Sequence, residues 1–447
     1  MKVLKFGGTS VGSSNSIKNV KSIIQSIDGQ KIIVLSAMSG VTNLLVDISD
    51  NIHLGNQADL IRLEESLKNK HLELVETLIP QSEIRSVVLQ GLEKLFAEFH
   101  LLIHGEFSEN SANQILIFGE TLSTYIFNEY LRSCNIASIL LNAKKFMFVG
   151  NLENPDTAKI NQHLQPFLKN ISEDAIYITQ GFVRIDKFNR ISTLKRGGSD
   201  YTATIIGAAI DAEEVQIWTD IDGFHNNDPR YVANTHPLSN LSFEEAAELA
   251  YFGAKILHPQ TISPVIEKHI PIYLKNTFTP ELHGTKISSE IHSKGLKAIS
   301  AKDGITAIKI KSNRMLMAHG FLKKIFEIFD FHETAIDMIT TSEIAISLTI
   351  DDTKNLDLIL NDLEEFGEIT VEMEHSIICI VGEGLIEDAN TYKLFEILNE
   401  IPVRMISYGG SLNNVSILVA SENKVFALKA LHQKLFSSKP VAIGLKF

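Results

Sequence analysis

Short apolar runs alternate with longer amphipathic stretches along the first two thirds of the chain. Residues 2–6, 31–36 and 175–179 are runs of strand length in which apolar residues predominate. Such runs are typical of strands that helices cover on both faces. The periodicity of the remaining stretches predicts helices over 13–27, 58–78, 83–104, 112–132, 203–210 and 243–250, and strands over 214–218 and 270–274. Up to about residue 290 the pattern therefore predicts an α/β domain with a parallel sheet between helices.

A shorter pattern begins after Lys294-Gly295 and occurs twice. The first copy predicts strand 305–310, helix 320–331, strands 335–339 and 344–350, helix 354–366 and strand 369–373. The second copy predicts strand 377–381, helix 388–398, strands 403–407 and 415–419, helix 422–435 and strand 441–445. Repetition of the order βαββαβ predicts two ferredoxin-like modules, a type that usually binds ligands or partners.

Composition and charge exclude several classes of function. The 447 residues are 44% hydrophobic, which suits several globular domains and not a disordered chain. The balance of 41 basic and 54 acidic residues gives a net charge of −13, so neither nucleic acid nor an anionic membrane surface is an expected partner. No apolar run approaches the roughly 20 residues that cross a bilayer, and the N-terminus lacks signal-peptide features. We therefore expect a cytoplasmic protein.

The two cysteines, Cys134 and Cys379, are far apart and lack metal-ligand spacing. This argues against a disulfide framework or a zinc site formed by cysteines. We expect both side chains to be buried as small hydrophobic groups.

Three glycine-containing turns follow predicted strands, over 5–10, 36–43 and 196–200. Such turns present backbone N–H groups to anions, and the carboxyl ends of parallel strands are where open α/β sheets bind ligands. Lys5 lies on an otherwise apolar strand, where a surface lysine is not expected. Arg196 and Asp200 flank two glycines and a serine, a set of groups that could hold both the carboxylate and the ammonium of an amino acid. The chain has neither a Gly-x-x-x-x-Gly-Lys phosphate loop nor the protein-kinase motifs.

Taken in order, these segments resemble the aspartokinases of the amino acid kinase family. The resemblance rests on Lys-Phe-Gly-Gly-Thr-Ser from Lys5, Ser-Ala-Met-Ser-Gly-Val-Thr-Asn from Ser36, Phe-Gly-Glu from Phe118, Arg-Gly-Gly-Ser-Asp from Arg196, Trp-Thr-Asp from Trp218, Asp-Pro-Arg from Asp228 and Gly-Ala-Lys-Ile-Leu-His-Pro from Gly253. It implies a three-layer α/β/α kinase domain over 1–294 and two ACT regulatory modules over 295–375 and 376–447, with the last strand available to complete the first module. It also implies a monofunctional enzyme without a homoserine dehydrogenase half.

The activity that the resemblance implies is phosphoryl transfer from ATP, with Mg²⁺, to the β-carboxylate of L-aspartate. The products are 4-phospho-L-aspartate and ADP, and the step leads toward lysine, threonine and methionine. A carboxylate with a pKa of about 3.9 is already ionised at neutral pH, so no general base is required. Two alternatives remain: another amino acid kinase, acting on glutamate or N-acetylglutamate, and a catalytically silent amino-acid sensor that retains the ACT modules.

The resemblance also implies the roles of individual residues. Lys5 and Asp200 are the implied catalytic residues, and no residue is assigned as a metal ligand. The implied aspartate site comprises Ser36, Thr42, Glu120, Phe182, Arg196, Gly197 and Ser199, with Arg196 on the α-carboxylate and Glu120 on the ammonium or in an organising contact. The implied ATP site comprises Lys5, Gly7, Gly8, Thr219, Asp220, His225, Asp228, Arg230 and Lys255.

The chain departs from the family pattern at two positions. Lys195 stands where the family usually has glycine, so we expect ordinary backbone angles there and an additional cation near the substrate. His225 stands where many members have tyrosine in the nucleotide loop.

The first module resembles the effector site of lysine-inhibited aspartokinases. The implied effector residues are Met315, Phe321, Leu322, Ile336, Asp337, Ser342 and Glu343, with Met315 in a packing role. A helix N-terminus can take the effector's carboxylate, while Asp337 and Glu343 can take its cationic groups. Threonine is the alternative effector. We expect a homodimer or higher homo-oligomer, because ACT modules expose sheet edges or faces that pair.

Overall fold

The computed structural model describes residues 1–168, 174–195, 197–253, 257–312, 319–389 and 391–436. Contacts within the chain divide it into two compact units. Unit 1 consists of residues 1–224, 239–243 and 257–290, and unit 2 consists of residues 225–238, 244–256 and 291–447. The chain therefore passes from one unit to the other several times. No helix in the described segments has the length and apolarity of a membrane span.

Unit 1 is built on one large sheet. Its strands are β1 (Lys2–Phe6), β2 (Lys31–Leu35), β3 (Ser138–Leu140), β4 (Ile176–Gln180), β7 (Val215–Thr219), β8 (Asn240–Ser242), β9 (Ile272–Asn276) and β10 (Thr285–Ser288). Among the described residues these eight strands follow the order β3-β4-β2-β1-β7-β9-β10-β8. The pairs from β3 to β9 are parallel, and β10 runs antiparallel to β9. A separate hairpin pairs β5 (Val183–Ile185) with β6 (Ile191–Thr193).

Helices cover both faces of this sheet. They are α1 (Ser14–Ser26), α2 (Val41–Leu54), α3 (Gln57–Leu78), α4 (Ser82–Ile103), α5 (Glu109–Leu116), α6 (Phe118–Ser133), α7 (Thr157–Leu168), α8 (Gly198–Ala209) and α10 (Pro259–Ile266). On one face α6 packs against β2, β3 and β4, with α2, α3 and α4 beyond it. On the other face α8 packs against β1, β2 and β7 and contacts α7 and α10. The predicted α/β domain with a sheet between helix layers is confirmed.

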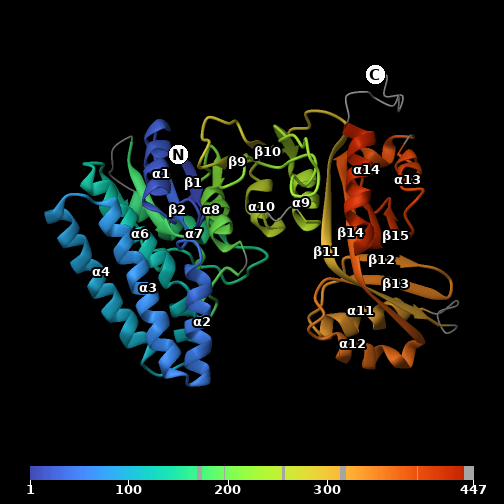
Figure 1. Cartoon of the computed structure of the whole chain (residues 1–447), viewed down its shortest axis with the longest axis horizontal. Coiled ribbons are helices and arrows are strands. Elements are labelled where there is room, and N and C mark those ends of the chain that lie inside the picture. The colour runs from blue at the N-terminus through green and yellow to red at the C-terminus, as the bar shows by residue number, and fades with distance from the viewer. Residues whose placement is uncertain (169–173, 196, 254–256, 313–318, 390, 437–447) are drawn as a thin grey trace. The chain divides into compact units, whose positions relative to one another are not determined.

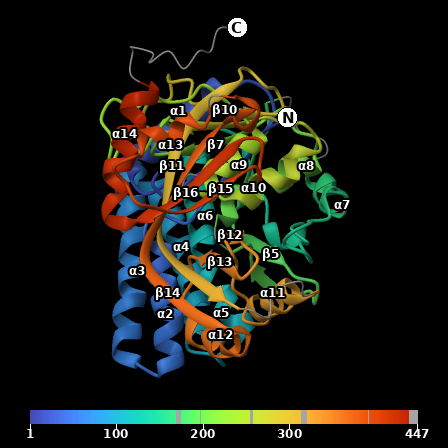
Figure 2. The same ribbon diagram turned by 90° about the vertical axis from the view of Figure 1, so that its right-hand side faces the viewer.

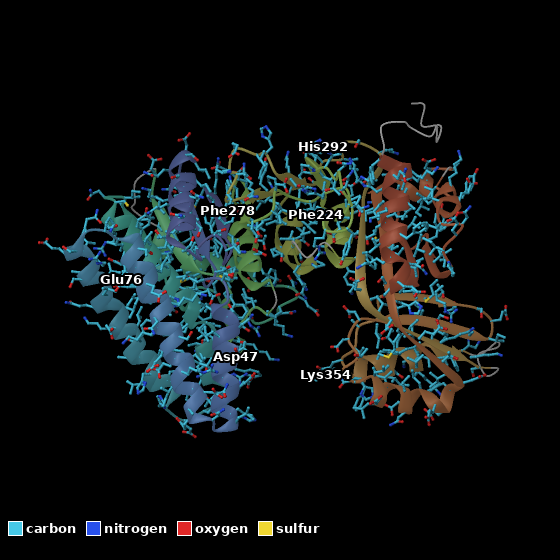
Figure 3. All side chains as sticks on the ribbon, in the orientation of Figure 1. Asp47, Glu76, Phe224, Phe278, His292 and Lys354 are labelled. Carbon is cyan, nitrogen blue, oxygen red and sulfur yellow. The ribbon has the colours of Figure 1, made fainter. Side chains whose placement is uncertain are left out.

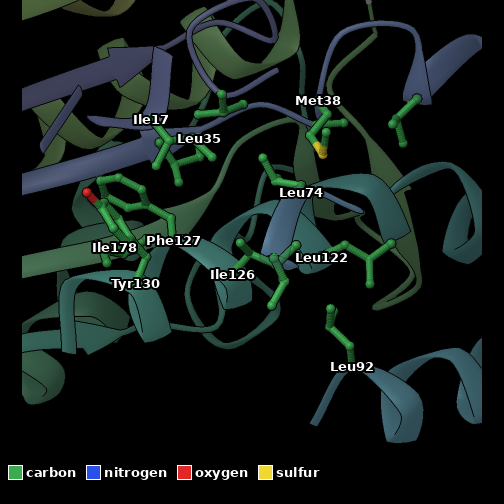
Figure 4. Close-up of a cluster of buried hydrophobic side chains, with 14 of the residues drawn as sticks. Ile17, Leu35, Met38, Leu74, Leu92, Leu122, Ile126, Phe127, Tyr130 and Ile178 are labelled. Atoms are coloured by element: carbon green, nitrogen blue, oxygen red, sulfur yellow. The ribbon is translucent and has the colours of Figure 1, made fainter. Parts of the chain in front are cut away.

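The alternation of side chains along β1 and β2 determines which layer each residue faces. Leu4 and Phe6 of β1, with Ile33 and Leu35 of β2, belong to one apolar cluster with residues of α1, α2, α3, α4 and α6. Figure 4 shows part of this cluster, in which Leu35 and Ile178 of the sheet lie near Phe127 of α6. Because successive side chains of a strand point to opposite faces, Lys5 points away from this cluster.

Two differences between the predicted and observed helices of unit 1 have clear local causes. The single helix predicted over 112–132 is two helices, α5 and α6, because the chain turns at Ile117, whose N–H bonds to the carbonyls of Asn113 and Ile115. The helix predicted to begin at Ala203 begins at Gly198, because Gly197 adopts a left-handed N-cap conformation with φ 69°. The polar residues of its first turn made this helix look shorter in the sequence.

Unit 2 contains a second sheet and the helices that cover it. Its elements are α9 (Phe243–Tyr251, with Phe243 in unit 1), β11 (Gly295–Lys311), α11 (Phe321–Phe331), β12 (Met338–Thr341), β13 (Ala345–Ile350), α12 (Leu356–Leu363), β14 (Glu368–Glu383), α13 (Lys393–Ile397), β15 (Val403–Tyr408), β16 (Asn414–Ala420) and α14 (Lys424–Phe436). In the described part of the chain, six strands follow the order β12-β13-β11-β14-β16-β15. The predicted βαββαβ order recurs in these elements, while the last predicted strand, 441–445, lies outside the described residues.

The strands predicted over 305–310, 369–373 and 377–381 are parts of two much longer strands. β11 begins at Gly295, and β14 runs without a break from Glu368 to Glu383 beside it (Figures 1 and 2). Glu374, at φ 58°, and the register shifts near Ile305 mark where the paired strands bend. The polar residues at this bend suggested a gap between strands. The module limit proposed at 375/376 lies inside β14, and the domain limits stay a prediction.

Two apolar clusters lie along this continuous sheet. Ile308 and Ile310 of β11 pack with residues of α11 and α12, whereas Ile299, in the first half of β11, packs with residues of β16 and α14. The second cluster also contains Val232, and the Ile299 N–H donates to the Asn226 carbonyl at 3.0 Å. The segment 225–238 is therefore part of the packing of unit 2.

Charged side chains such as Asp47 and Glu76 project from the exposed faces of α2 and α3 (Figure 3). By contrast, Phe99 of α4 is fully buried and its ring centroid lies 4.6 Å from that of Phe118.

We expect Phe99→Ala to lower the free energy of unfolding by about 3–5 kcal/mol, because it removes a large buried side chain and leaves a cavity. Urea unfolding of the full chain measures this. Leu101→Ala, on the same helix at a position 73% exposed, is the matched control and should change stability by no more than about 0.5 kcal/mol. Equal effects of the two substitutions would contradict the predicted core.

Candidate active site

A cavity of about 390 Å³ lies in unit 1 where the neighbouring parallel strands β4, β2 and β1 end. Its lining residues are Lys5, Ser36, Thr42, Glu120, Phe182, Lys195, Gly197, Gly198, Ser199 and Asp200. Eight of these ten residues are predicted catalytic or substrate-binding residues. The cavity also occupies the edge of the sheet at which an open α/β sheet binds ligands. Arg196, predicted to bind a carboxylate, lies outside the described residues.

An ion pair between Lys5 and Asp200 crosses from the sheet to α8. The Lys5 Nζ lies 2.6 Å from Asp200 Oδ1, and the two side chains are only 10% and 13% exposed. Lys5 reaches α8 because its position on β1 points away from the α6 face, and Asp200 is in the first turn of α8. Removing two charges from water costs free energy, and their mutual attraction offsets part of it. The pair therefore keeps a cation at the wall of the cavity.

Two helix N-termini contribute to the same cavity. α2 and α8 both begin after a glycine in the left-handed conformation, Gly40 at φ 79° and Gly197 at φ 69°, and neither has a side-chain cap. Thr42 lies in the first turn of α2, and Ser199 in that of α8. Uncapped N–H groups and the positive end of the helix dipole attract anions. The cavity is thus favourable for a carboxylate or phosphate although the whole chain is acidic.

Glu120 is a buried carboxyl group in the first turn of α6. It accepts a hydrogen bond from the Ala37 N–H at 3.1 Å through Oε1, while Oε2 has no hydrogen-bond partner in the described part of the protein. Burial raises the pKa of Glu120 to about 8, although the Ala37 N–H and the charge of Lys5 act in the opposite direction. Ser123, one turn later, donates to the Ser36 carbonyl at 2.8 Å and fixes α6 against the turn after β2.

The predicted glycine positions permit close approaches around the cavity. A Cβ atom on Gly8 would lie 2.8 Å from the Ala37 carbonyl oxygen, so any larger residue would push the turns after β1 and β2 apart. Gly7 lies beside the Lys5 ammonium, since a Cβ there would be 3.5 Å from Nζ. Neither glycine lines the cavity itself, but both shape the turn that ends β1.

Lys195 corrects one prediction from the sequence. We expected ordinary backbone angles because the residue is not glycine, but Lys195 has φ 60°, in the left-handed region. The Gly198 N–H donates to the Lys195 carbonyl at 3.2 Å, so the tight turn into α8 requires this conformation. Lys195 also lines the cavity, where an additional cation was expected, and so does Gly198, which was not among the predicted site residues. Gly198 could have been predicted, because it is the second glycine of the Arg-Gly-Gly-Ser-Asp segment.

The residues predicted to bind ATP lie in different parts of the fold. Thr219 and Asp220 are at the carboxyl end of β7, next to β1, with the Thr219 hydroxyl donating to Asp220 Oδ1 at 3.1 Å. Within unit 2, His225 Nδ1 lies 2.9 Å from the Thr235 hydroxyl, and Arg230 forms a 2.6 Å ion pair with Asp228. Lys255 is outside the described residues.

The predicted effector residues lie around the first half of the unit 2 sheet. Phe321 and Ile336 belong to one apolar cluster, and Leu322 is next to Phe321 in the first turn of α11. Ser342 and Glu343 occupy the turn between β12 and β13, where the Ser342 N–H donates to the Ala345 carbonyl at 2.8 Å. Met315 lies outside the described residues.

Asp337 already has a cationic partner within the chain. Its Oδ1 lies 2.6 Å from Lys302 Nζ and accepts a 2.8 Å hydrogen bond from the Tyr251 hydroxyl, while Lys302 also lies 4.4 Å from the centre of the Tyr251 ring. The carboxylate is buried, and Oδ2 has no hydrogen-bond partner among the described residues. Burial raises the pKa of Asp337, and the contacts with Lys302 and Tyr251 oppose that rise.

Two segments of the chain match known protein families. Residues 1–276 match the amino acid kinase family, and residues 374–435 match an ACT domain. The lysine-sensitive aspartokinase 3 of Escherichia coli (strain K12) is 30% identical over 450 residues, covering 97% of this chain and 99% of that protein. Aspartokinase 3, chloroplastic, of Arabidopsis thaliana is 32% identical over 461 residues, covering 98% and 82%.

Solved structures of a relative agree with this comparison. The crystal structure of E. coli aspartokinase III in complex with aspartate and ADP, in the R-state, superposes with a TM-score of 0.86 at 29% identity, covering 98% of this chain and 100% of that one. The same enzyme in complex with lysine and aspartate, in the T-state, gives 0.81 at 30% identity, with the same coverage. The predicted amino acid kinase fold with a C-terminal ACT domain is thereby confirmed, and the chain belongs to the aspartokinases of the amino acid kinase family.

Proposed function

We propose that this protein transfers the γ-phosphoryl group of ATP to the β-carboxylate of L-aspartate. The observation that carries the proposal is the cavity in which the Lys5–Asp200 ion pair, two uncapped helix N-termini and the buried Glu120 meet. These groups offer cations and N–H donors for anionic oxygens, and a carboxyl group for an ammonium. The set matches an amino acid substrate whose side-chain carboxylate meets a phosphate.

The reaction makes few demands on acid–base chemistry. A β-carboxylate oxygen forms a bond to the γ-phosphorus while the bond from that phosphorus to the ADP oxygen breaks, and no proton is transferred. The barrier comes from bringing two anions together in line, so the protein must position them and stabilise the charge on the transferring group. Lys5 is the residue we assign to that charge, with Asp200 holding its ammonium in place. Thr42, Ser199 and the first turn of α8 are assigned to the aspartate carboxylates.

ATP and Mg²⁺ complete the proposal. In unit 1 we assign Thr219 and Asp220, at the end of β7, to the nucleotide. His225, Asp228 and Arg230, in unit 2, are assigned to it on the family resemblance alone. Mg²⁺ prefers hard oxygen ligands and is usually held by substrate phosphates plus one or two carboxylates. The Asp200 carboxylate fits that donor set. When bound, Mg²⁺ would neutralise part of the phosphate charge.

Lys5→Ala tests the catalytic assignment. We expect the rate of ADP formation with aspartate to fall by about 10²–10³-fold or more, because a positioned cation at the transferring group is lost. The measurement is a coupled ADP assay, with circular dichroism to verify the fold. Lys2→Ala, at the half-buried start of the same strand and outside the cavity, is the matched control and should keep near-normal turnover. Near-normal turnover of Lys5→Ala would remove Lys5 from the mechanism.

The same assay with glutamate and N-acetylglutamate separates the substrate assignments. We expect turnover with aspartate to exceed turnover with either alternative substrate. Faster ADP formation with one of them would replace aspartate by that substrate, and absence of turnover with all three would favour the silent amino-acid sensor.

Glu120 provides a test of how the substrate ammonium is bound. With a pKa of about 8, Glu120 is mainly protonated at pH 7 in the free protein. An incoming ammonium stabilises the ionised form, so aspartate binding should release close to one proton at pH 7 and almost none well above pH 8. Calorimetric titrations in buffers of different ionisation enthalpy measure the number of protons. Glu120→Gln should abolish the release, whereas Glu129→Gln, on the same helix, should retain it. Aspartate binding without proton release at pH 7 would place the ammonium elsewhere.

We propose lysine as the feedback inhibitor. The α11 N-terminus follows Gly320 at φ 80° and has no side-chain cap, so it is suited to the effector's carboxylate. Asp337 Oδ2 is suited to an ammonium, because Lys302 and Tyr251 contact only Oδ1. The E. coli relative that carries "lysine-sensitive" in its name supports this choice of effector.

Asp337→Asn should weaken inhibition by lysine. We expect the lysine concentration for half-inhibition to rise at least about tenfold, since a charge-assisted contact becomes a neutral one, while the rate without lysine stays within about twofold. Asp352→Asn, at an exposed position of the same module, is the control and should leave inhibition unchanged. If threonine and not lysine inhibits the unmodified enzyme, the effector assignment is reversed.

We also propose that copies of the chain associate through unit 2 into a homodimer or higher homo-oligomer. The exposed apolar side chains Phe326 and Phe331 of α11 and Leu358 of α12 support an association surface there. Light scattering coupled to size-exclusion chromatography measures the mass, and a monomer at assay concentration would refute this assignment.

A further inference from the structure

Three side chains of types that commonly bind metal ions converge on the outer helices of unit 1, away from the residues assigned to catalysis. They are Glu64 of α3, His100 of α4 and His104, the C-cap residue of α4. His100 Nδ1 lies 2.9 Å from Glu64 Oε1, and His104 Nε2 lies 3.6 Å from Glu64 Oε2. One ligand atom from each residue lies within 4.8 Å of the other two. In the described residues, this is the one such group of three or more histidine, cysteine or acidic side chains.

The two helices hold these side chains together independently of any ion. α3 and α4 pack side by side (Figures 1 and 2), and their inner faces place Leu60, Phe99 and Ile103 in the apolar cluster of unit 1. An ion pair between Lys68 and Glu93, at 2.9 Å, also connects the helices. His100 and His104 are four residues apart, so their rings lie on one face of the helix, with centroids 4.3 Å apart. The convergence therefore follows from packing and helical spacing.

The arrangement is close to the geometry that zinc requires. Zinc binds imidazole nitrogen and carboxylate oxygen at about 2.0–2.2 Å, so neighbouring ligand atoms of a tetrahedral site are roughly 3.3–3.6 Å apart. The carboxylate-to-imidazole separations are 2.9 Å from Glu64 Oε1 to His100 and 3.6 Å from Glu64 Oε2 to His104, so small shifts of the side chains would bring the three ligands within this range. We propose that Glu64, His100 and His104 bind one divalent transition-metal ion of the zinc class, with water in the remaining coordination position.

The chemistry of the three ligands also distinguishes this site from the magnesium of the kinase reaction. Two imidazoles and one carboxylate suit zinc, copper or nickel, whereas magnesium prefers oxygen ligands only. His100 is 56% exposed, so an ion can enter from solvent, while Glu64 is 18% exposed and its carboxylate contacts both imidazoles. An ion at this position would bind α3 to α4 and stabilise the pair. The proposal is independent of the substrate and of the regulator.

Zinc titration of the full chain tests the proposal. The protein, stripped with a chelator and dialysed, is titrated with Zn²⁺ in excess Mg²⁺ and without ATP, because ATP itself binds zinc. We expect saturable binding of one ion per chain and a rise in the melting temperature with free zinc. In parallel, Co²⁺ should give the visible absorption of a site with nitrogen ligands. Absence of binding, or displacement of the zinc by Mg²⁺, would overturn the proposal.

Variants identify the ligands. His104→Ala should weaken zinc binding at least about tenfold, and His100→Ala with His104→Ala should abolish both the binding and the thermal shift. Glu64→Gln, which keeps the shape of the side chain, should weaken binding and serves as a second test if the double variant does not fold by circular dichroism. His283→Ala, at an exposed position outside the cluster, is the control and should bind zinc normally. One ion bound unchanged by the double variant or by Glu64→Gln would place the site elsewhere and refute the proposal.

Discussion

The ion pair between Lys5 and Asp200 is the contact on which the organisation of the cavity depends. It joins the central strand β1 to the first turn of α8, and both residues are largely removed from solvent. Removal of one partner leaves the other as an uncompensated buried charge. This destabilises a protein far more than replacement of both residues by apolar ones. The pair therefore fixes the Lys5 ammonium beside the first turn of α8, at the wall of the cavity.

The chain is acidic as a whole, yet its cavity favours anions, because the net charge is spread over the surface while the anion-binding groups are concentrated at one point. A net charge of −13 acts over the whole surface and is screened by salt within about 10 Å. The cavity attracts anions through Lys5 and the N–H groups at the starts of α2 and α8. Helix N-termini contribute partial positive charge without adding a basic residue. An acidic protein can therefore bind two anionic substrates together, provided that its donors converge at one point.

The sequence predicted features that depend on local pattern and missed those that depend on packing. Strands β1 and β2 and helices α3 and α4 were predicted to within about two residues, since their apolar periodicity is strong. The continuity of β14 through Glu374 was not, because its pairing with β11 determines it. The break at Ile117 and the left-handed Lys195 were not either, because each depends on the hydrogen bonds of a single turn, which leave no mark on the apolar periodicity. For the cavity, the motifs indicated most of the residues that meet there. The approach of Glu64 to His100 spans 36 residues and leaves no pattern in the sequence.

The repeated crossing of the chain between the two units affects how its parts could exist separately. Residues 225–238 and 244–253 precede the ACT domain in sequence, yet they pack within unit 2, where Val232 joins the cluster of Ile299 and Glu244 accepts a hydrogen bond from Asn413. A chain shortened at residue 294 would keep these segments and lose the residues that bury them. The C-terminal part is therefore not a separable addition to a kinase domain that is complete without it. Loss of the modules by proteolysis or by mutation would expose apolar surface within the remaining chain, so the two parts are expected to persist, and to evolve, together.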